Sequence, residues 1–186
     1  MTNAVIQEAK KRMEKVEADL RAELATMRTG RASLSILDHV RVDYYGTPTP
    51  LRDIAKLSVS DPTTLTVQAW DASTLPLIEK AIRAADLGLN PANDGKVIRV
   101  PIPPLTDERR KELVKHLHKV LEAHRTGIRN IRREVNDTFK KLLKEKKISE
   151  DDEKRALDEV QKATDQAISR LDEMGKNKEK EILSVS

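Results

Sequence analysis

Apolar residues near the N-terminus recur every three or four positions, which is the spacing of one face of an α-helix. The stripe ends at Thr29 and Gly30, where glycine is a common stop signal. It consists of Val5, Ala9, Met13, Val16, Leu20, Leu24 and Met27. This pattern predicts a first long helix that runs to the Thr29-Gly30 pair.

After Gly30 the apolar period changes to two, which indicates β-strands. Apolar and polar side chains alternate over residues 40–45 and 65–70, and shorter alternations occur at 57–59 and 98–102. Between them, the sequence STLPLIEKAIRAADLG predicts a helix, with Pro76 in its first turn and Gly88 as its stop. All eight prolines lie between residues 48 and 104. We therefore predict that residues 31–104 form a separate small β/α/β domain.

The helical period returns after Thr106 and is sustained for longer. One face carries Leu113, Leu117, Val120, His124, Ile128, Ile131, Val135 and Leu142. A helix from about 106 to 146 would be roughly 60 Å long. A third helix follows a Ser149–Asp152 capping box, and its stripe is Leu157, Val160, Thr164, Ile168, Leu171 and Met174. Gly175 is expected to weaken this helix by about 1 kcal/mol relative to alanine.

These elements predict an α+β fold in which residues 1–30 and 105–186 form an elongated, discontinuous three-helix bundle. The small domain is inserted between the first and second helices. The chain crosses the boundary at Gly30-Arg31 and at Pro103, Pro104 and Leu105. Because glycine frees backbone angles and proline restricts them, these crossings are candidates for a hinge. The alternative is that they are ordinary terminators of helices and strands.

Several chemistries lack the residues that they require. The chain has no cysteine, which excludes disulfides and thiolate metal sites. The four histidines show no metal-binding spacing, and no glycine-rich phosphate loop occurs. We therefore expect no enzyme activity, no cofactor and no metal site. No secretory signal or membrane-spanning stretch is visible, so a cytoplasmic protein without a membrane partner is expected.

Positive charge is concentrated in residues 105–147, where basic side chains outnumber acidic ones about two to one. Many of them keep the spacing of one helix stripe, interrupted by Glu122: Lys111, Lys115, His118, Arg125, Arg129, Arg132 and Lys140. We expect this stripe to face solvent, with Arg133 adding to a cluster of guanidinium groups. Arginine donates paired hydrogen bonds to phosphate, so the stripe predicts a surface for a nucleic-acid backbone. A solvated helix face with intrahelical ion pairs is the alternative.

Tyr44 and Tyr45 are half of the aromatic residues in the chain. Strand alternation places them on opposite faces of the sheet, so at most one is expected to be buried. The other ring either stacks on a partner or covers the neighbouring proline turn.

Seven segments together resemble the bacterial ribosome recycling factor family, in order and over nearly the whole chain. They are RTGRAS (28–33), YYGTPTPL (44–51), DLGLNP (86–91), IRVPIPPLTDERRKEL (98–113), RNIRREVND (129–137), KISEDD (147–152) and VQKATD (160–165).

The resemblance implies an L-shaped, monomeric protein that binds the post-termination 70S ribosome. With elongation factor G, which hydrolyses the GTP, such a factor splits the ribosome into subunits and catalyses nothing itself. The resemblance also implies contacts with large-subunit ribosomal RNA through Arg28, Arg31, Arg129, Arg132 and Arg133. Two other functions remain open from the residues alone: a coiled-coil adaptor for protein helices, and a phosphoryl- or acyl-transfer enzyme, which would lack a recognisable nucleophile, base and phosphate loop.

Overall fold

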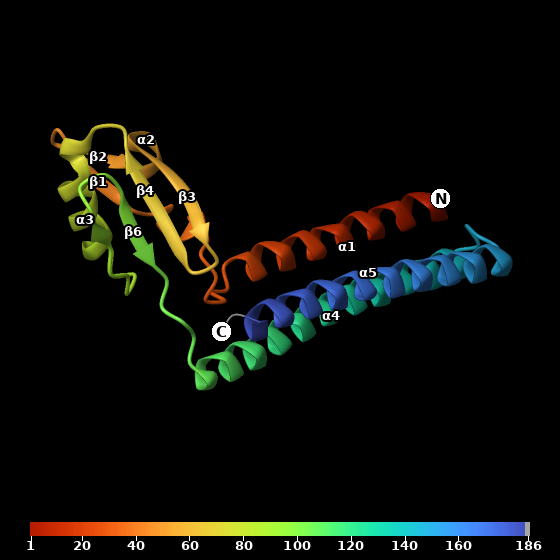
Figure 1. Cartoon of the computed structure of the whole chain (residues 1–186). Coiled ribbons are helices and arrows are strands. Elements are labelled where there is room, and N and C mark those ends of the chain that lie inside the picture. The colour runs from red at the N-terminus through yellow and green to blue at the C-terminus, as the bar shows by residue number, and fades with distance from the viewer. Residues whose placement is uncertain (185–186) are drawn as a thin grey trace. The chain divides into compact units, whose positions relative to one another are not determined.

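The computed structural model describes residues 1–184, which form two compact units (Figure 1). Residues 1–28 and 107–184 make up the helical bundle, and residues 29–106 make up the inserted unit. The bundle contains α1 (Thr2–Ala25), α4 (Asp107–Lys144) and α5 (Glu150–Ser184). The α+β class is confirmed. α4 begins and ends within two residues of the predicted bounds.

The first helix is shorter than predicted and ends at Ala25 rather than near Gly30. Thr26 closes the last turn, because its hydroxyl donates a hydrogen bond of 2.7 Å to the Glu23 carbonyl. The backbone N–H of Met27 also turns back, to the Leu24 carbonyl. A local side chain to backbone bond of this kind competes with continuation of the helix.

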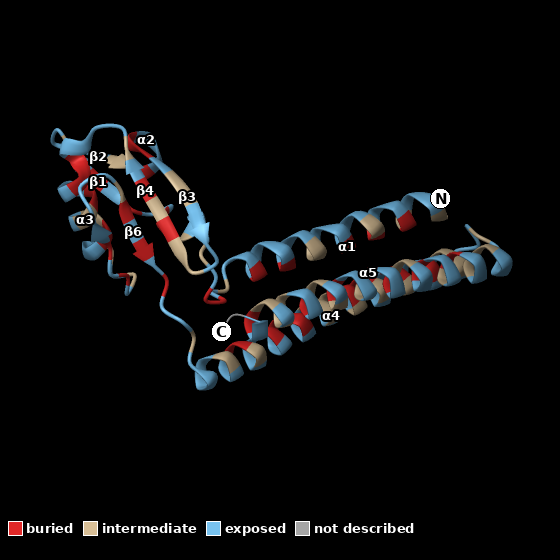
Figure 2. Cartoon of the chain, viewed as in Figure 1, coloured by how far each residue is buried: buried red, intermediate tan, exposed pale blue. Residues whose placement is uncertain are grey.

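The three helices bury one apolar stripe each, visible as the buried positions in Figure 2. The predicted stripes are partly displaced. On α1, Ile6 is buried and Val5 is only half-buried, and on α4, Phe139 is fully buried in place of Leu142. On α5 the buried set includes small residues, among them Ala156 and Ala167. Small side chains are buried where helices approach closely, which a search for large apolar residues does not detect.

The predicted capping box begins α5. The Asp152 N–H donates to the Ser149 hydroxyl, and the Ser149 N–H donates to the Asp152 carboxylate, each at 3.1 Å. The hydrogen bonds from Ser149 lower the pKa of Asp152. Two backbone N–H groups at the start of the helix, which lack partners within the helix, thus each receive an acceptor.

The inserted unit contains two antiparallel sheets and short helices. β1 (Arg41–Tyr44) pairs with β2 (Thr47–Pro50), and a four-stranded sheet has the order β3-β4-β6-β5. Its strands are β3 (Ala55–Asp61), β4 (Thr64–Ala69), β5 (Ala92–Asn93) and β6 (Ile98–Pro101). The helices are α2 (Leu51–Ile54) and α3 (Leu75–Ala84), with 3₁₀ turns at Leu34–Leu37 and Ala72–Thr74.

Alternation along the central strands builds the core of this unit. Leu65 and Val67 of β4 are fully buried, as are Ile98 and Val100 of β6 and Ile78 of α3. β2 was not predicted, because its TPTP sequence carries two prolines. Within residues 1–184, β2 pairs only with β1, so its other edge needs no N–H donors.

Tyr45 does not continue β1, so the prediction that the two tyrosines occupy opposite faces of a sheet is wrong. Tyr45 and Gly46 form the two-residue turn of the β1–β2 hairpin, with φ of 50° and 81°. Tyr45 is 84% exposed, whereas Tyr44 is half-buried. The two rings meet edge to face, 4.6 Å between centroids. A ring this exposed does not cover the prolines of β2.

Residues close to the two chain crossings both form hydrogen bonds with the Pro62-Thr63 turn of the inserted unit. The Ala32 N–H donates to the Pro62 carbonyl at 2.8 Å, and the Ile102 N–H donates to the Thr63 carbonyl at 2.7 Å. Gly30 is buried at φ +78°, where an added Cβ would lie 3.2 Å from Leu105. The two units divide after Arg28 and after Thr106, beside the residues predicted as a hinge. Hinge motion at these residues stays a prediction.

Candidate nucleic-acid interface

The basic stripe of α4 begins with exposed side chains. Lys111 and Lys115 are exposed, and the Nε2 atom of His118 lies 3.6 Å from the Glu179 carboxylate of α5. Apolar positions on α4 face the bundle, so charged residues on the opposite positions remain at the surface. The stripe is therefore available to a partner at its N-terminal end.

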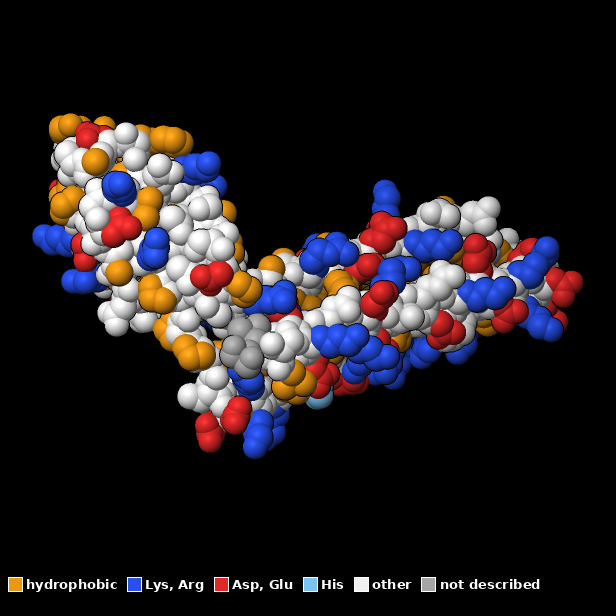
Figure 3. All heavy atoms as spheres, in the orientation of Figure 1, with side chains coloured by type: hydrophobic (Ala, Val, Ile, Leu, Met, Phe, Trp, Pro, Cys, Tyr) orange, Lys and Arg blue, Asp and Glu red, His pale blue; other side chains and the backbone are white. Residues whose placement is uncertain are grey.

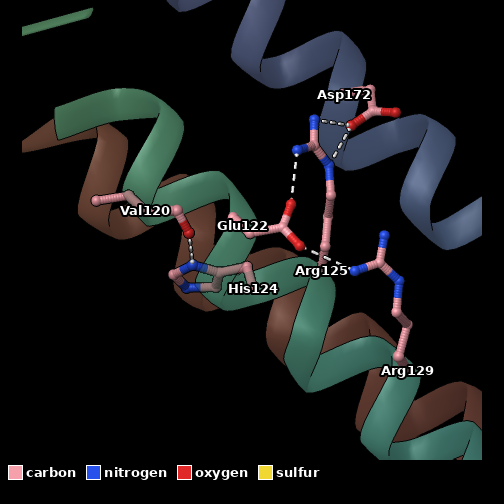
Figure 4. A network of polar contacts seen from close by, with 6 residues as sticks. All are labelled: Val120, Glu122, His124, Arg125, Arg129 and Asp172. Atoms are coloured by element: carbon pink, nitrogen blue, oxygen red, sulfur yellow. Dashed lines mark hydrogen bonds and ion pairs between the residues drawn. The ribbon is translucent and has the colours of Figure 1, made fainter. Parts of the chain in front are cut away.

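The middle of the stripe is an ion-pair network (Figure 4). Arg125 donates from Nε to the Asp172 carboxylate of α5 at 2.7 Å, and its Nη2 lies 2.5 Å from the same oxygen. Its Nη1 atom donates to Glu122 Oε2 at 3.1 Å. Arg129 donates to the other Glu122 oxygen, Oε1, at 2.9 Å. Two arginines and two carboxylates therefore balance one another here.

Hydrogen bonding favours the charged forms of Glu122 and Arg125. The bonds from Arg129 and Arg125 lower the pKa of Glu122. Burial by itself lowers the pKa of Arg125, but its bonds to Asp172 and Glu122 outweigh burial, and the net change is upward. Arg125 is thus a cation whose acceptors are already in place.

The stripe lies closer to α5 than predicted. Arg132 donates to the Gln161 side chain of α5 at 3.3 Å, and Gln161 in turn donates to Asp165 at 2.9 Å. Arg125 is only 27% exposed because it leans across to Asp172. The prediction that the whole stripe points away from the bundle is therefore wrong in its middle part, where the stripe runs along the edge between α4 and α5.

Among the arginines of the stripe, positive charge is least compensated at Arg132 and Arg133. The partner of Arg132 is a neutral amide. Arg133 is exposed and makes no hydrogen bond or ion pair within residues 1–184. Figure 3 shows Lys and Arg side chains along the visible face of the bundle, with Asp and Glu side chains among them. The local balance of partners thus decides which arginines can accept a new anion.

Arg28 does not lie beside the three predicted arginines of α4. α1 runs antiparallel to α4, since Arg12 pairs with Glu134 and Glu23 approaches His124. Continuing this alignment puts Arg28, just beyond α1, level with about Lys119 of α4, which is about 20 Å along the bundle from Arg133 at 1.5 Å per residue. Arg28 is exposed on the bundle, and Arg31 is exposed on the inserted unit.

His124 is a packed residue, as its position on the apolar face predicts. Its Nδ1–H donates to the Val120 carbonyl at 2.7 Å (Figure 4). Its Nε2 lies 3.6 Å from the Glu23 carboxylate of α1. Within residues 1–184, no group of three or more potential ligands is placed to hold a metal ion. No helix in that range is long and apolar enough to span a membrane.

Sequence reasoning missed the α5 side chains that complete the network. The spacing of Glu122, Arg125 and Arg129 along one helix face is a visible signal for ion pairs within α4. Asp172 and Gln161 carry no comparable signal, because their contacts depend on the register of α5 against α4.

Comparison with known proteins agrees with this arrangement. The protein-family model for "Ribosome recycling factor" matches residues 20–183. A ribosome-recycling factor of Symbiobacterium thermophilum is 52% identical over 185 residues, covering 100% of both chains. A solution structure of the ribosome recycling factor aligns with a TM-score of 0.74 and 43% identity, over 99% of this chain and 98% of that one.

A second structure presents models for the T. thermophilus ribosome recycling factor and the E. coli elongation factor G bound to the E. coli post-termination complex. Its matching chain is 48% identical, with a TM-score of 0.63, over 98% of this chain and 99% of that one. Family match and relatives agree over nearly the full length. The chain belongs to the ribosome recycling factor family.

Proposed function

We propose that this protein binds the post-termination 70S ribosome and, with elongation factor G, splits it into subunits. Elongation factor G would hydrolyse the GTP, while the present chain supplies a binding surface and a rigid body without catalysing a covalent step. It would act as a monomer in the cytoplasm and use no cofactor. Support comes from family membership and from the neighbour that is bound with elongation factor G to a post-termination complex.

The observation that carries the proposal is the uncompensated positive charge at Arg132 and Arg133. Both lie on a continuous 38-residue helix, which holds them on a stiff support. A guanidinium group that lacks a carboxylate partner can donate two hydrogen bonds to a phosphate. Large-subunit ribosomal RNA offers such phosphates, and Arg28, Arg31 and Arg129 would extend the contact.

The mechanism that we propose is mechanical. The arginines hold the bundle on ribosomal RNA while elongation factor G displaces the inserted unit about the two chain crossings. Gly30, Arg31, Pro103, Pro104 and Leu105 would restrict this movement to a narrow path. Displacement would then break contacts between the ribosomal subunits.

Arg133→Ala tests the contact with RNA, because Arg133 has no partner within residues 1–184 to lose. Affinity for purified bacterial 70S ribosomes should fall several-fold, and the slope of log K against log salt should become shallower by about 1. Lys162→Ala removes one charge from an exposed position of α5 and is the matched control. Unchanged affinity and slope for R133A, with intact helicity, would refute the role of Arg133. Tight binding at high salt would instead favour a protein-docking adaptor.

A further inference from the structure

We propose that Glu122 is a built-in competitor for the RNA phosphate, which limits the affinity of α4 and speeds release of the factor. This inference rests on the proposed function, since it concerns the same surface. Glu122, an acidic residue within the basic stripe, would thus promote dissociation of the factor from the ribosome. The ligand class is the phosphate backbone of ribosomal RNA.

The first step of the argument is that Glu122 is not needed to hold Arg125. Asp172 already accepts from Nε of Arg125 and lies 2.5 Å from its Nη2, so that guanidinium is anchored across the helices. Glu122 adds a third contact, in which Arg125 Nη1 donates to its carboxylate at 3.1 Å. The contact that depends on Glu122 alone is the one to Arg129.

The second step is that the Arg129 contact lies where a phosphate would approach. Glu122 is 56% exposed and Arg129 is 39% exposed, so their bond is at the surface. Arg129 lies three and four residues before Arg132 and Arg133, on adjacent positions of the same helix face. A phosphate held by these arginines comes within reach of Arg129, whose Nη1 donor is occupied by a carboxylate.

The third step is the direction and size of the effect that the Glu122 charge has on affinity for a phosphate. A carboxylate and a phosphate are both anions that accept from the same guanidinium, so the bound phosphate must either displace Glu122 or lie beside it. Two unit charges about 7 Å apart in water repel enough to change a binding constant about threefold. The alternative is that Glu122 orients Arg129 for phosphate binding. In that case loss of the Glu122 charge would weaken binding to the ribosome.

Glu122→Gln separates these two roles, since glutamine keeps the shape and loses the charge. We expect E122Q to bind 70S ribosomes about threefold more tightly at low salt, to dissociate more slowly, and to show a steeper salt dependence. Glu122→Asp keeps the charge and should restore the wild-type affinity. Glu173→Gln makes the same charge change at an exposed position of α5 and should have a smaller effect.

The possible failures are distinguishable. If wild type binds in a salt-dependent way but E122Q binds equally or more weakly, the competitor role is overturned and the proposed function stands. An equal gain in E122Q and E173Q also overturns it, because the effect would then reflect net charge alone. If wild type itself shows no salt-dependent binding, both proposals fail.

Discussion

Replacing Gly175 with alanine is expected to destabilise the bundle, although alanine is the better helix former. Gly175 is buried within α5, where an added Cβ would lie 2.3 Å from Leu121 Cδ1 and 3.0 Å from Leu121 Cδ2 of α4. Leu121 is itself buried, so its side chain has little room to rotate away. Glycine at this position permits the close approach of the two helices.

The net effect is a difference between two opposing contributions. Exchange of glycine for alanine inside a helix contributes about 1 kcal/mol of stability. Forcing a methyl group into a packed core costs about 1–3 kcal/mol. We therefore expect Gly175→Ala to lower the free energy of unfolding by about 1 kcal/mol, against the gain of about 1 kcal/mol that the sequence alone predicts.

Gly127 of α4 provides a matched control. It also lies inside a long helix of the bundle, but an added Cβ there would meet only Val16, at 3.9 Å, an ordinary contact. Gly127→Ala should therefore raise the free energy of unfolding by about 1 kcal/mol. Urea unfolding followed by far-UV circular dichroism would measure both variants.

A double substitution identifies the clash as the cause. In a Leu121→Ala background the added methyl group has space, so Gly175→Ala should change sign and become stabilising by about 1 kcal/mol. The packing argument is refuted if Gly175→Ala and Gly127→Ala stabilise the wild-type protein equally. It is also refuted if the clash penalty persists after Leu121 is truncated.

Two further predictions concern a helix cap and two glycines at positive φ. Ser149→Ala should destabilise the bundle by about 1 kcal/mol through loss of the cap. Because the pKa of Asp152 is lowered, the stabilisation from its carboxylate is present above about pH 4 and is lost as the pH falls through that lowered pKa, which acid titration of both proteins would detect. Gly30→Ala and Gly46→Ala both place a side chain at φ near +80°, but only Gly30 also meets Leu105, so Gly30→Ala should be the more destabilising by about 1 kcal/mol in thermal unfolding. Equal losses for the two glycine variants would contradict the steric part of the argument.

The long helices were predictable because their apolar period is sustained over many turns. The capping box at Ser149 was equally visible, since it depends on residues only three positions apart. The end of α1 and the existence of β2 were not predictable by the same means. The end of α1 depends on local hydrogen bonds of Thr26 and Met27. β2 depends on pairing with β1 across a turn whose Tyr45 resembles a strand residue.

The candidate site was also only partly predictable from the sequence. The positive stripe on α4 follows from spacing within one helix, and so do the contacts of Glu122 with Arg125 and Arg129. Which arginine is neutralised from α5 follows only from helix register. His118 meets Glu179 and Arg125 meets Asp172, seven residues apart on each helix, so one antiparallel alignment sets both contacts.

The packing at Gly175 and the chemistry at the arginines are therefore connected. Leu121 meets Gly175 one turn before Arg125 meets Asp172, so the close helix contact holds the register in which Asp172 faces Arg125. The same register places a neutral side chain, Gln161, beside Arg132. An uncharged glycine thus helps to decide which guanidinium groups are balanced within the protein and which remain available for phosphate.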